Sequence, residues 1–326
     1  MEPILKQEIV SNKFINNLLN DSSVEEIWIN SPGKIFIARN GISELTNNVL
    51  SENEIVVLLE QLLRNSGRRL DVTHPFVDAF LPDGSRLHAV IPNITQKWPA
   101  INIRKFKDSN LKLNDLFENK MFSAQIYNFL REINRSAKNV IISGTTGAGK
   151  TTFLSALLNT LPRKTRIVTC EEVFELKLNS IDQVALQTRD ENLDSVGEID
   201  LRRLIKEALR MRPDRLVLGE VRQAEALDLL IALNSGICGM ATIHANSAKD
   251  AINKLFLLPL LGGPNIQEEF IKRTVSNVIN YIIHLSRNQT GFRYISEIIE
   301  IQPTNNQNYF EINEIYSQDN KLEQAI

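Results

Sequence analysis

The feature that most constrains this chain is a glycine-rich run, Gly144 to Thr151, which reads Gly-Thr-Thr-Gly-Ala-Gly-Lys-Thr. It matches the pattern G-x-x-x-x-G-K-[ST], in which small residues let backbone N–H groups wrap phosphates at a helix N-terminus. The apolar residues 139–143 before it predict a buried strand, and residues 151–158 after it predict a helix. A strand, this loop and a helix in that order favour an α/β fold with a parallel sheet.

The residue types in this loop predict its ligands as well as its shape. Lys150 has the length and charge to reach the β- and γ-phosphates of a nucleotide, and the Thr151 hydroxyl suits Mg²⁺. ATP and Mg²⁺ are therefore the expected ligands. The residues expected to surround the phosphates are Gly144, Thr145, Thr146, Gly147, Ala148, Gly149, Lys150, Thr151 and Thr152.

Strands and helices alternate from residue 121 onward. The expected strands are 139–143, 165–169, 215–219 and 239–243, and the expected helices include one after an Asp200 N-cap and one over 224–233. Three of these strands run into Glu171, Glu220 and His244. Because ligands of open α/β sheets bind at the carboxyl ends of the strands, these side chains are candidates for the site.

The acidic residues suggest roles around a triphosphate. Glu220 follows an apolar strand, where a carboxylate can polarise the attacking water and help to hold Mg²⁺. Glu171 and Glu172 are adjacent like charges, which repel unless one of them faces Mg²⁺ or an arginine. Thr151, Glu172 and Glu220 are the expected metal ligands. Solvated alternatives stay open for the Glu171–Glu172 pair and for Glu175, and His244 either senses the γ-phosphate or is structural.

Arginines that stabilise the charge of phosphoryl transfer are harder to select, because most arginines on exposed helices are merely solvated. The candidates are Arg104, Arg189, Arg202, Arg203, Arg210 and Arg212.

The first third of the chain reads as α+β. A helix is expected over 3–20, and Ser51 to Glu54 forms a capping-box pattern before a second helix that Gly67 would end. Expected strands cover 24–30, 34–38 and 100–104, with a turn at Asn40-Gly41 and a hairpin of 77–81 and 86–91. We expect an N-terminal domain over 1–106, a linker over 107–120 and a P-loop domain over 121–326.

Composition excludes several classes of protein. The 326-residue chain has a formal net charge of -2, which disfavours a nucleic-acid binder. Two cysteines, Cys170 and Cys238, exclude a disulfide framework and a four-cysteine zinc site. The sequence has neither a signal-peptide pattern nor an apolar stretch long enough to cross a bilayer, so a cytoplasmic protein is expected.

Four segments together resemble boxes of the secretion-system traffic ATPases, the hexameric motors of type II and type IV secretion and pilus assembly. The similarity runs from about residue 10 to 300. The boxes are a Walker A loop at 144–151, an acidic box at 170–176, an atypical Walker B box at 209–222 and a histidine box at 239–247. The acidic box departs from the family's usual Ile-Glu-Asp, because Glu172 stands where aspartate is usual.

Shorter stretches resemble the CpaF/TadA type, which drives Flp (tight-adherence) pilus assembly. They are 69–89, 101–106, 186–189, 284–287 and 291–293. The TrbB-type ATPases of conjugative transfer share the Walker B and histidine boxes and are the close rival. The GspE and PilB types carry clustered cysteines that this chain lacks, and the pilus-retraction signature is absent from its sequence.

The resemblance implies a PAS-like N-terminal domain before a RecA-like ATPase core, with nucleotide between them. It implies that Glu220 is the catalytic carboxylate with Glu171 assisting, and that His244 senses the γ-phosphate. Arg104 would reach the nucleotide from the N-terminal domain, and Arg189 resembles an arginine near a subunit interface. The implied partners are copies of the chain in a hexamer and an inner-membrane platform protein, through which the ATPase would lie peripherally at the cytoplasmic face.

Three functions stay open at this point. The chain is a motor for pilus assembly or protein secretion, the same motor in a conjugative DNA-transfer apparatus, or a nucleotide-gated scaffold with little turnover. Direct nucleic-acid binding is not expected, since the sequence has no interleaved basic and aromatic stripe.

Overall fold

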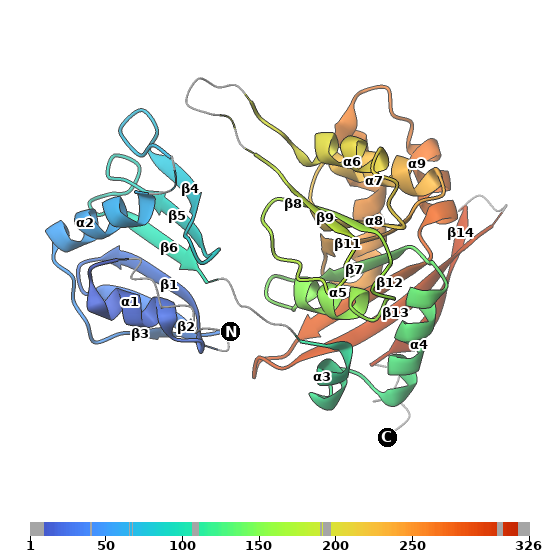
Figure 1. Ribbon diagram of the computed structural model, residues 1–326, viewed down its shortest axis with the longest axis horizontal. Helices are drawn as coiled ribbons and strands as arrows, with labels where there is room; N and C mark the ends of the chain where they lie inside the picture. The colour runs from blue at the N-terminus through green and yellow to red at the C-terminus, as the bar shows by residue number, and fades with distance from the viewer. Residues whose placement is uncertain are drawn as a thin grey trace. The chain divides into compact units, whose positions relative to one another are not determined.

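The computed structural model describes residues 10–39, 41–64, 66, 68–105, 111–189, 191, 197–304 and 309–318. The chain divides into two compact units, Met1–Asp108 and Ser109–Ile326, which are considered separately below (Figure 1). Within the described ranges, no helix combines the length and the apolar character needed to cross a membrane.

The first unit is built on a six-stranded antiparallel sheet with the order β3-β2-β1-β6-β5-β4. Its strands are β1 (Val24–Ser31), β2 (Lys34–Arg39), β3 (Ile42–Leu45), β4 (Phe76–Phe80), β5 (Arg86–Val90) and β6 (Ala100–Arg104). Side chains alternate between buried and exposed along β4, β5 and β6, so one face of this part of the sheet is buried. The expected α+β composition and the hairpin of β4 and β5 are confirmed. The PAS-like description stays a prediction.

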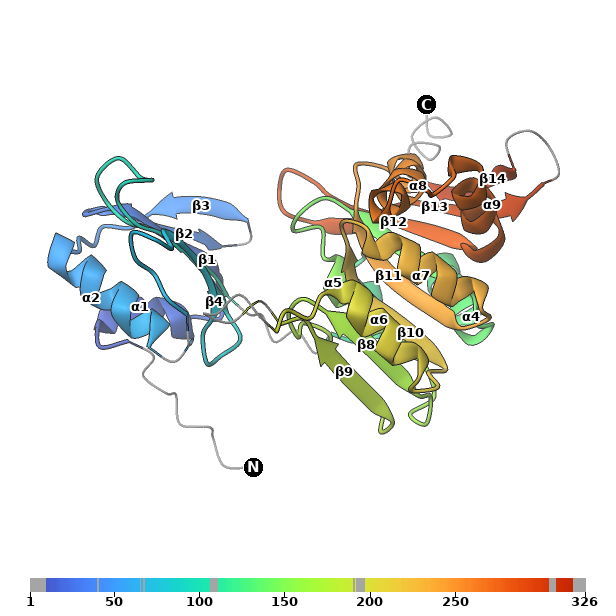
Figure 2. The same cartoon turned by 90° about the horizontal axis from the view of Figure 1, so that it is seen from above.

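Two helices, α1 (Lys13–Asn20) and α2 (Glu52–Leu63), cover that buried face (Figure 2). The expected capping box is confirmed, because the Ser51 hydroxyl accepts from the Glu54 N–H and the Glu54 carboxylate accepts from the Ser51 N–H. Of the expected helix over 3–20, residues 10–12 are not helical. Asn12 caps the helix through its side chain, so α1 begins at Lys13, and residues 3–9 lie outside the described ones. Asn40 and Gly67 also lie outside them.

Part of the expected linker is folded. Residues 106–110 lie outside the described ones, but α3 (Leu113–Glu118) follows directly. Leu113 and Leu116 of this helix are buried in a core of the second unit. Most residues of 107–120 are polar, which is why the segment reads as a linker. The two leucines lie three residues apart, so they share one face of the helix and can pack into the core.

The second unit is built on an eight-stranded sheet with the order β14-β13-β12-β7-β11-β10-β8-β9. Its strands are β7 (Val140–Gly144), β8 (Ile167–Glu171), β9 (Gln183–Gln187), β10 (Arg215–Val221), β11 (Cys238–His244), β12 (Tyr281–Arg287), β13 (Arg293–Pro303) and β14 (Phe310–Ser317). The strands from β7 to β12 pair in parallel, as expected. The strands β13 and β14 extend the sheet in antiparallel fashion, which the sequence pattern did not indicate.

Helices cover both faces of this sheet (Figure 2). One face carries α3, α4 (Ala124–Arg135) and α5 (Lys150–Leu158). The other carries α6 (Leu201–Leu209), α7 (Glu225–Asn234), α8 (Ala248–Leu257), the 3₁₀ turn η1 (Leu258–Gly262) and α9 (Glu268–Val278). The Asp200 N-cap of α6 is confirmed, because its carboxylate accepts from the Arg203 N–H at 2.7 Å.

The site is positioned by β7, which lies between β11 and β12 in the middle of the sheet. Gly144 at the end of β7 is in register with His244 on one side and with Leu285 on the other. All five residues of β7 are buried. The carboxyl ends of these three strands therefore form one rigid edge, from which the glycine-rich loop leads into α5.

Candidate nucleotide site

The glycine-rich loop joins β7 to α5 with a backbone that only small residues allow. Gly147 and Gly149 have φ angles of 75° and 90°, in the left-handed region that favours glycine. Gly149 is the N-cap of α5, so the N-terminal N–H groups of the helix open onto the loop. The exposed side chains of Thr145 and Thr146 lie on the loop between β7 and these glycines. This is the backbone arrangement expected of a phosphate cradle.

Lys150 lies across the loop. Its ammonium donates to the carbonyl oxygens of Gly144 at 3.1 Å and of Thr145 at 3.3 Å. It also lies 3.7 Å from a Glu220 carboxylate oxygen, and its side chain is only 10% exposed. The ammonium is thus held between the loop and the strand-end acid, where a triphosphate would need a positive charge.

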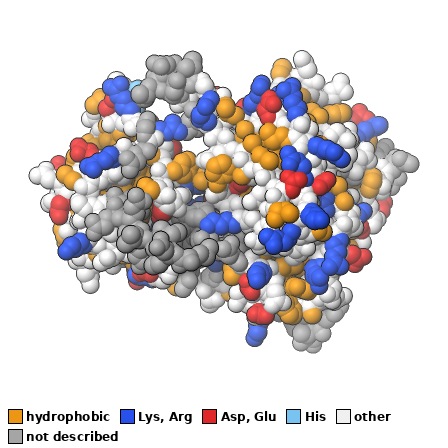
Figure 3. Space-filling view, viewed as in Figure 1, with side chains coloured by type: hydrophobic (Ala, Val, Ile, Leu, Met, Phe, Trp, Pro, Cys, Tyr) orange, Lys and Arg blue, Asp and Glu red, His pale blue; other side chains and the backbone are white. Residues whose placement is uncertain are grey.

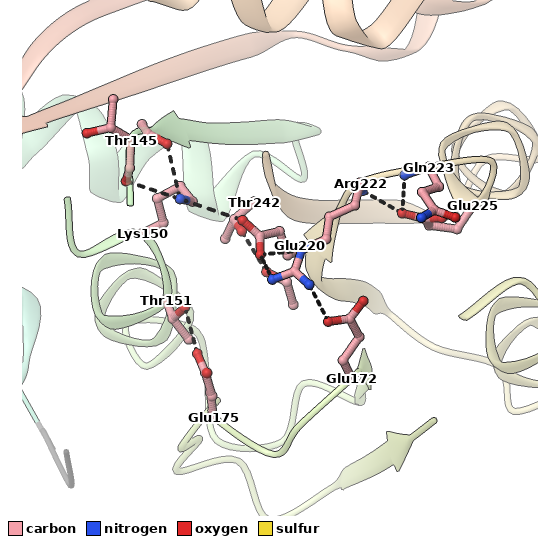
Figure 4. A network of polar contacts seen from close by, with 12 residues as sticks. Thr145, Lys150, Thr151, Glu172, Glu175, Glu220, Arg222, Gln223, Glu225 and Thr242 are labelled. Carbon is pink, nitrogen blue, oxygen red and sulfur yellow. Dashed lines mark hydrogen bonds and ion pairs between the residues drawn. The ribbon is translucent and has the colours of Figure 1, made fainter. Parts of the chain in front are cut away.

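Glu220 is the centre of a network of polar contacts (Figure 4). One of its oxygens accepts two hydrogen bonds from Arg222, at 2.8 Å from Nε and 2.5 Å from Nη2. Burial raises the pKa of Glu220, but the charges of Arg222 and Lys150 outweigh it and hold the pKa below its ordinary value. The carboxylate is therefore ionised at neutral pH and able to accept a proton or orient a water.

Arg222 connects Glu220 to a second acid, since its Nη1 donates to Glu172 at 2.7 Å. The backbone N–H of Arg222 is in turn held by the Glu225 carboxylate at 2.5 Å, at the start of α7. Arg222 thus resolves the expected repulsion around Glu172 by facing that carboxylate. Arg222 lies in the Walker B box, but the sequence of that box does not by itself assign it a role.

Glu171 differs from its neighbour Glu172 in being almost fully buried. One of its oxygens accepts from the Thr169 hydroxyl at 2.9 Å, and the other from the N–H groups of Glu175 and Leu176 at 2.8 and 2.9 Å. Burial raises the pKa of Glu171, although these backbone hydrogen bonds act in the opposite direction. Both oxygens bind the protein's own donors, so Glu171 holds the segment that carries Glu175. An assisting role in catalysis stays a prediction.

Oxygen ligands for Mg²⁺ are present, but they do not form a closed cage. The Thr151 hydroxyl donates to Glu175 at 3.1 Å, on the α5 side of the network in Figure 4. The described residues hold no cluster of three or more His, Cys, Asp or Glu side chains suited to a metal. This donor set fits Mg²⁺, which keeps several waters and binds one or two protein oxygens together with substrate phosphates.

His244 ends β11 next to Gly144, and its side chain is exposed. The imidazole, when it is protonated, adds to the lowering of the Glu220 pKa by Arg222 and Lys150. The carbonyl oxygen of His244 accepts from the Lys254 ammonium at 2.8 Å, which fixes the end of the strand. The histidine therefore lies at the same sheet edge as the loop, and its sensing role stays a prediction.

The expected arginines lie in different surroundings. Arg104 ends β6 in the first unit, with its Nε 3.8 Å from Glu26. Arg189 donates to the carbonyl oxygen of Gly197 at 2.9 Å and is exposed. Three further candidates bind acids of α6 and α7, namely Arg202, Arg203 and Arg210. Arg212 is exposed and has a φ angle of 52°. Among the described residues, the hydrogen bonds and ion pairs of these arginines are made away from the glycine-rich loop, so their catalytic roles stay predictions.

Two other arginines lie beside the loop, and one of them bonds to it. Arg293 donates from Nε to the carbonyl oxygen of Gly147 at 2.8 Å. Arg287 lies with Nη1 3.2 Å from the position that a Cβ on Gly147 would take. Their only sequence signal was their place in stretches that resemble the CpaF/TadA type.

A central parallel sheet, helices on both faces and this loop at its carboxyl edge define a P-loop nucleoside triphosphatase with a RecA-like core. The sequence profile of the family described as "Type II/IV secretion system protein" matches residues 8–309. The chain therefore belongs to the type II/IV secretion system family, and it is an ATPase.

Alignments with related proteins cover most of the chain. The conjugal transfer protein TrbB of Rhizobium radiobacter is 30% identical over 296 residues, which is 89% of this chain and 88% of that protein. The type IV secretion system protein VirB11 of Bartonella quintana is 28% identical and covers 87% of this chain and 90% of its own length. Secretion or conjugation is thus the context of the family. The CpaF/TadA assignment stays a prediction.

Solved structures agree on the fold. The ATPase DotB of Legionella pneumophila has a TM-score of 0.61 at 19% identity, over 88% of this chain and 80% of that one. The pilus retraction motor PilT with bound ADP has a TM-score of 0.60 at 17% identity, over 96% of this chain and 87% of that one. At these identities the likeness concerns the fold alone.

Proposed function

We propose that this ATPase is a hexameric motor that energises pilus assembly or secretion across the bacterial envelope, with residues 144–152 binding the nucleotide and Glu220 acting on the attacking water. The observation that carries the proposal is the position of Lys150, whose ammonium spans the loop carbonyls and the ionised Glu220. A cation that lies between the loop and a general base suits the cleavage of a terminal phosphate.

Each residue of the site would have a separate role in ATP hydrolysis. Loop N–H groups and Lys150 bind the phosphates, and Glu220 orients the water and accepts its proton. Arg222 keeps Glu220 ionised and fixes its orientation. Thr151, Glu172 and Glu220 would hold Mg²⁺. Glu175 is a fourth candidate ligand, because its carboxylate accepts a hydrogen bond from the Thr151 hydroxyl. Bound Mg²⁺ neutralises phosphate charge.

His244, Arg104 and Arg189 would complete the site, with Glu171 assisting. His244 would sense the γ-phosphate from the end of β11. One of the arginines would stabilise the charge that develops in the transition state, because phosphoryl transfer needs positive charge beyond the metal. Glu171 would assist indirectly, since it binds the backbone N–H groups around Glu175.

A conjugative DNA-transfer motor is the second candidate, and the 30% identity to the conjugal transfer protein TrbB favours it. Neighbouring genes separate the two candidates. Prepilin and platform genes beside this gene would support Flp pilus assembly, whereas relaxase and coupling-protein genes would support conjugation.

The proposed partners are further copies of the chain and an inner-membrane platform protein, at the cytoplasmic face of that membrane. No direct binding of nucleic acid is proposed. The net charge of -2 supports this, as does the face drawn in Figure 3, on which basic side chains of the second unit are interspersed with acidic and apolar ones.

Phosphate release by purified protein with Mg²⁺ and ATP tests the site. We expect Glu220→Gln to lower kcat by about 100-fold or more with ATP still bound, because general-base catalysis contributes about 10²–10⁴-fold. Lys150→Ala should lose ATP binding. Glu268→Gln, on the exposed side of α9, is the matched control and should keep the parent rate.

Two results would contradict the proposal. Equal rates for Glu220→Gln and the parent would remove Glu220 from the chemistry. An ATP-dependent ring that releases no phosphate, even with membrane partners added, would favour the nucleotide-gated scaffold. The mass of the oligomer, measured with and without ATP in the same samples, tests the hexamer.

A further inference from the structure

The hairpin of β12 and β13 places two arginines against the glycine-rich loop from outside. Arg287 ends β12 and Arg293 begins β13, and the two residues are register partners in the antiparallel ladder. The turn between them is closed by Asn288, whose side chain accepts from the N–H groups of Thr290 and Phe292. Cross-strand partners project from the same face of a sheet, so both guanidinium groups point in one direction.

The base of this hairpin is fixed to the strand that carries the loop. Leu285 of β12 is in register with Gly144, and the next residue inward, His284, bonds to Ser143 of β7 at 2.8 Å. A Cβ on Gly144 would lie 2.6 Å from the Leu285 carbonyl oxygen, so the two backbones are in close approach. The arginines are thus held in a set position beside the loop.

Arg293 makes the most specific contact. Its Nε donates to the Gly147 carbonyl oxygen at 2.8 Å, and its Cδ lies 3.1 Å from where a Cβ on Gly149 would be. Arg287 lies 3.2 Å from the corresponding position at Gly147. Side chains at either glycine would displace these arginines, which adds a packing reason to the backbone reason for glycine there.

The hydrogen bond from Arg293 to the Gly147 carbonyl oxygen restrains the peptide group between Gly147 and Ala148. A trans peptide is planar, so its C=O and the following N–H point in opposite directions. Arg293 binds the carbonyl oxygen of this peptide, while the Ala148 N–H donates to the Thr145 carbonyl oxygen at 3.2 Å within the loop. Each end of the peptide group therefore has a hydrogen-bond partner, and Arg293 holds the carbonyl end.

We propose that Arg293, supported by Arg287, is a positioning residue of the ATPase, and that the β12–β13 hairpin sets the affinity for ATP by holding the Gly147 peptide. The proposal rests on the phosphate-binding role given above to the loop. Both side chains are half-buried and cationic, so they also add positive potential beside bound phosphates.

The test compares four variants of the full chain with the parent. The dissociation constant of ATP and the KM and kcat of phosphate release are measured for Arg293→Gln, Arg293→Lys, Arg287→Gln and Arg273→Gln. Arg273 pairs with Glu269 on the exposed side of α9 and is the matched control. Lys150→Ala is measured in parallel to test the loop itself.

We expect Arg293→Gln to weaken ATP binding and raise KM about tenfold, as for the loss of a hydrogen bond from a charged group, with kcat within about twofold. Arg293→Lys should recover part of this loss, because an ammonium can still donate to the carbonyl. Arg287→Gln should have a smaller effect in the same direction, and Arg273→Gln none.

The outcomes separate this proposal from the proposed function. If Lys150→Ala loses ATP and Arg293→Gln binds it as the parent does, the hairpin proposal is overturned and the loop assignment stands. If Lys150→Ala also binds ATP normally, the loop assignment itself has failed. If Arg293→Gln does not fold, the KM of Arg293→Lys tests the proposal instead, because lysine keeps the positive charge and most of the aliphatic part of the side chain. A KM equal to that of the parent would then count against positioning by the guanidinium.

Discussion

At the scale of single residues, the site depends on Arg222, whose guanidinium binds the carboxylates of both Glu220 and Glu172. Nε and Nη2 bind Glu220, and Nη1 binds Glu172. A planar fork can hold two carboxylates at a fixed angle, which an ammonium could not do. The second Glu220 oxygen stays on the side of Lys150, so the arginine leaves one oxygen for chemistry.

His284 gives the second unit a predictable response to acid. Burial beside Ser143 lowers the pKa of His284 from 6.5 to about 4, with Asp250 opposing and Lys150 reinforcing the shift. Between these values the unfolded chain binds a proton that the folded chain does not, so the stability present at pH 7 falls as pH drops from about 6.5 toward 4. Across this pH range the free energy of unfolding should fall by roughly 3 kcal/mol.

Urea unfolding of the parent and of His284→Gln, followed by circular dichroism at pH 7 and pH 5, checks this expectation. The variant should be less stable at pH 7 and should lose less stability on acidification than the parent. An equal loss in both proteins would mean that other groups cause the acid response.

The candidate site could be predicted from sequence only where its residues are close neighbours in the chain. Lys150 and Thr151 belong to one local motif, and Glu220 ends an apolar strand that is plain in the sequence. Arg293 is more than a hundred residues from Gly147, and only the pairing of β12 with β7 brings the two together. Glu171 and Glu172 look equivalent in the sequence, but burial directs one into the protein and the other toward Arg222.

At the scale of elements, local capping chemistry predicted helix starts well. The sequence predicts Ser51 and Asp200 as caps, and both accept the expected backbone N–H groups. The apolar pattern alone does not show that Asn12 is the cap of α1, so it extends the helix over residues 10–12, which are not helical. The antiparallel β13 and β14 were missed because their pairing is set by the sheet edge that β12 offers, which depends on the whole fold.

The capping box of α2 yields a prediction for the first unit. Ser51→Ala should lower its free energy of unfolding by about 1 kcal/mol, because the Glu54 N–H loses its side-chain partner. Ser51→Thr keeps the hydroxyl that accepts from the Glu54 N–H and donates to the Glu54 carboxylate, and it is the matched control. Tryptophan fluorescence during urea unfolding measures both variants, and an equal loss for both would show that the cap is not the cause.

At the scale of the whole molecule, the two units have separate hydrophobic cores. Both tryptophans of the chain, Trp28 and Trp98, belong to the first unit, and Trp28 stacks on Phe36. Fluorescence therefore reports the first unit, whereas circular dichroism reports helices of both. We expect the two signals to give different unfolding midpoints, since two cores need not unfold together.

Adding ADP should change the unfolding midpoint of the second unit, which carries the glycine-rich loop, more than that of the first. At about 100 times its dissociation constant, a ligand that binds only the folded state adds about 2.7 kcal/mol of stability. We expect ADP to raise the circular-dichroism midpoint of the parent and to leave that of Lys150→Ala unchanged. Coincident midpoints by both signals, with an equal ADP shift in each, would show instead that the units unfold as one.

The position of β7 in the sheet also bears on how the protein is made. Its two neighbours, β11 and β12, are synthesised about a hundred or more residues later, and Arg293 follows β12. A ribosome adds about 5–20 residues per second. For several seconds the nascent chain therefore holds a complete glycine-rich motif whose strand has no partner on either side. Until β11 and β12 have been made, β7 is an apolar strand with two unpaired edges, and such strands tend to pair with other chains when they are left exposed.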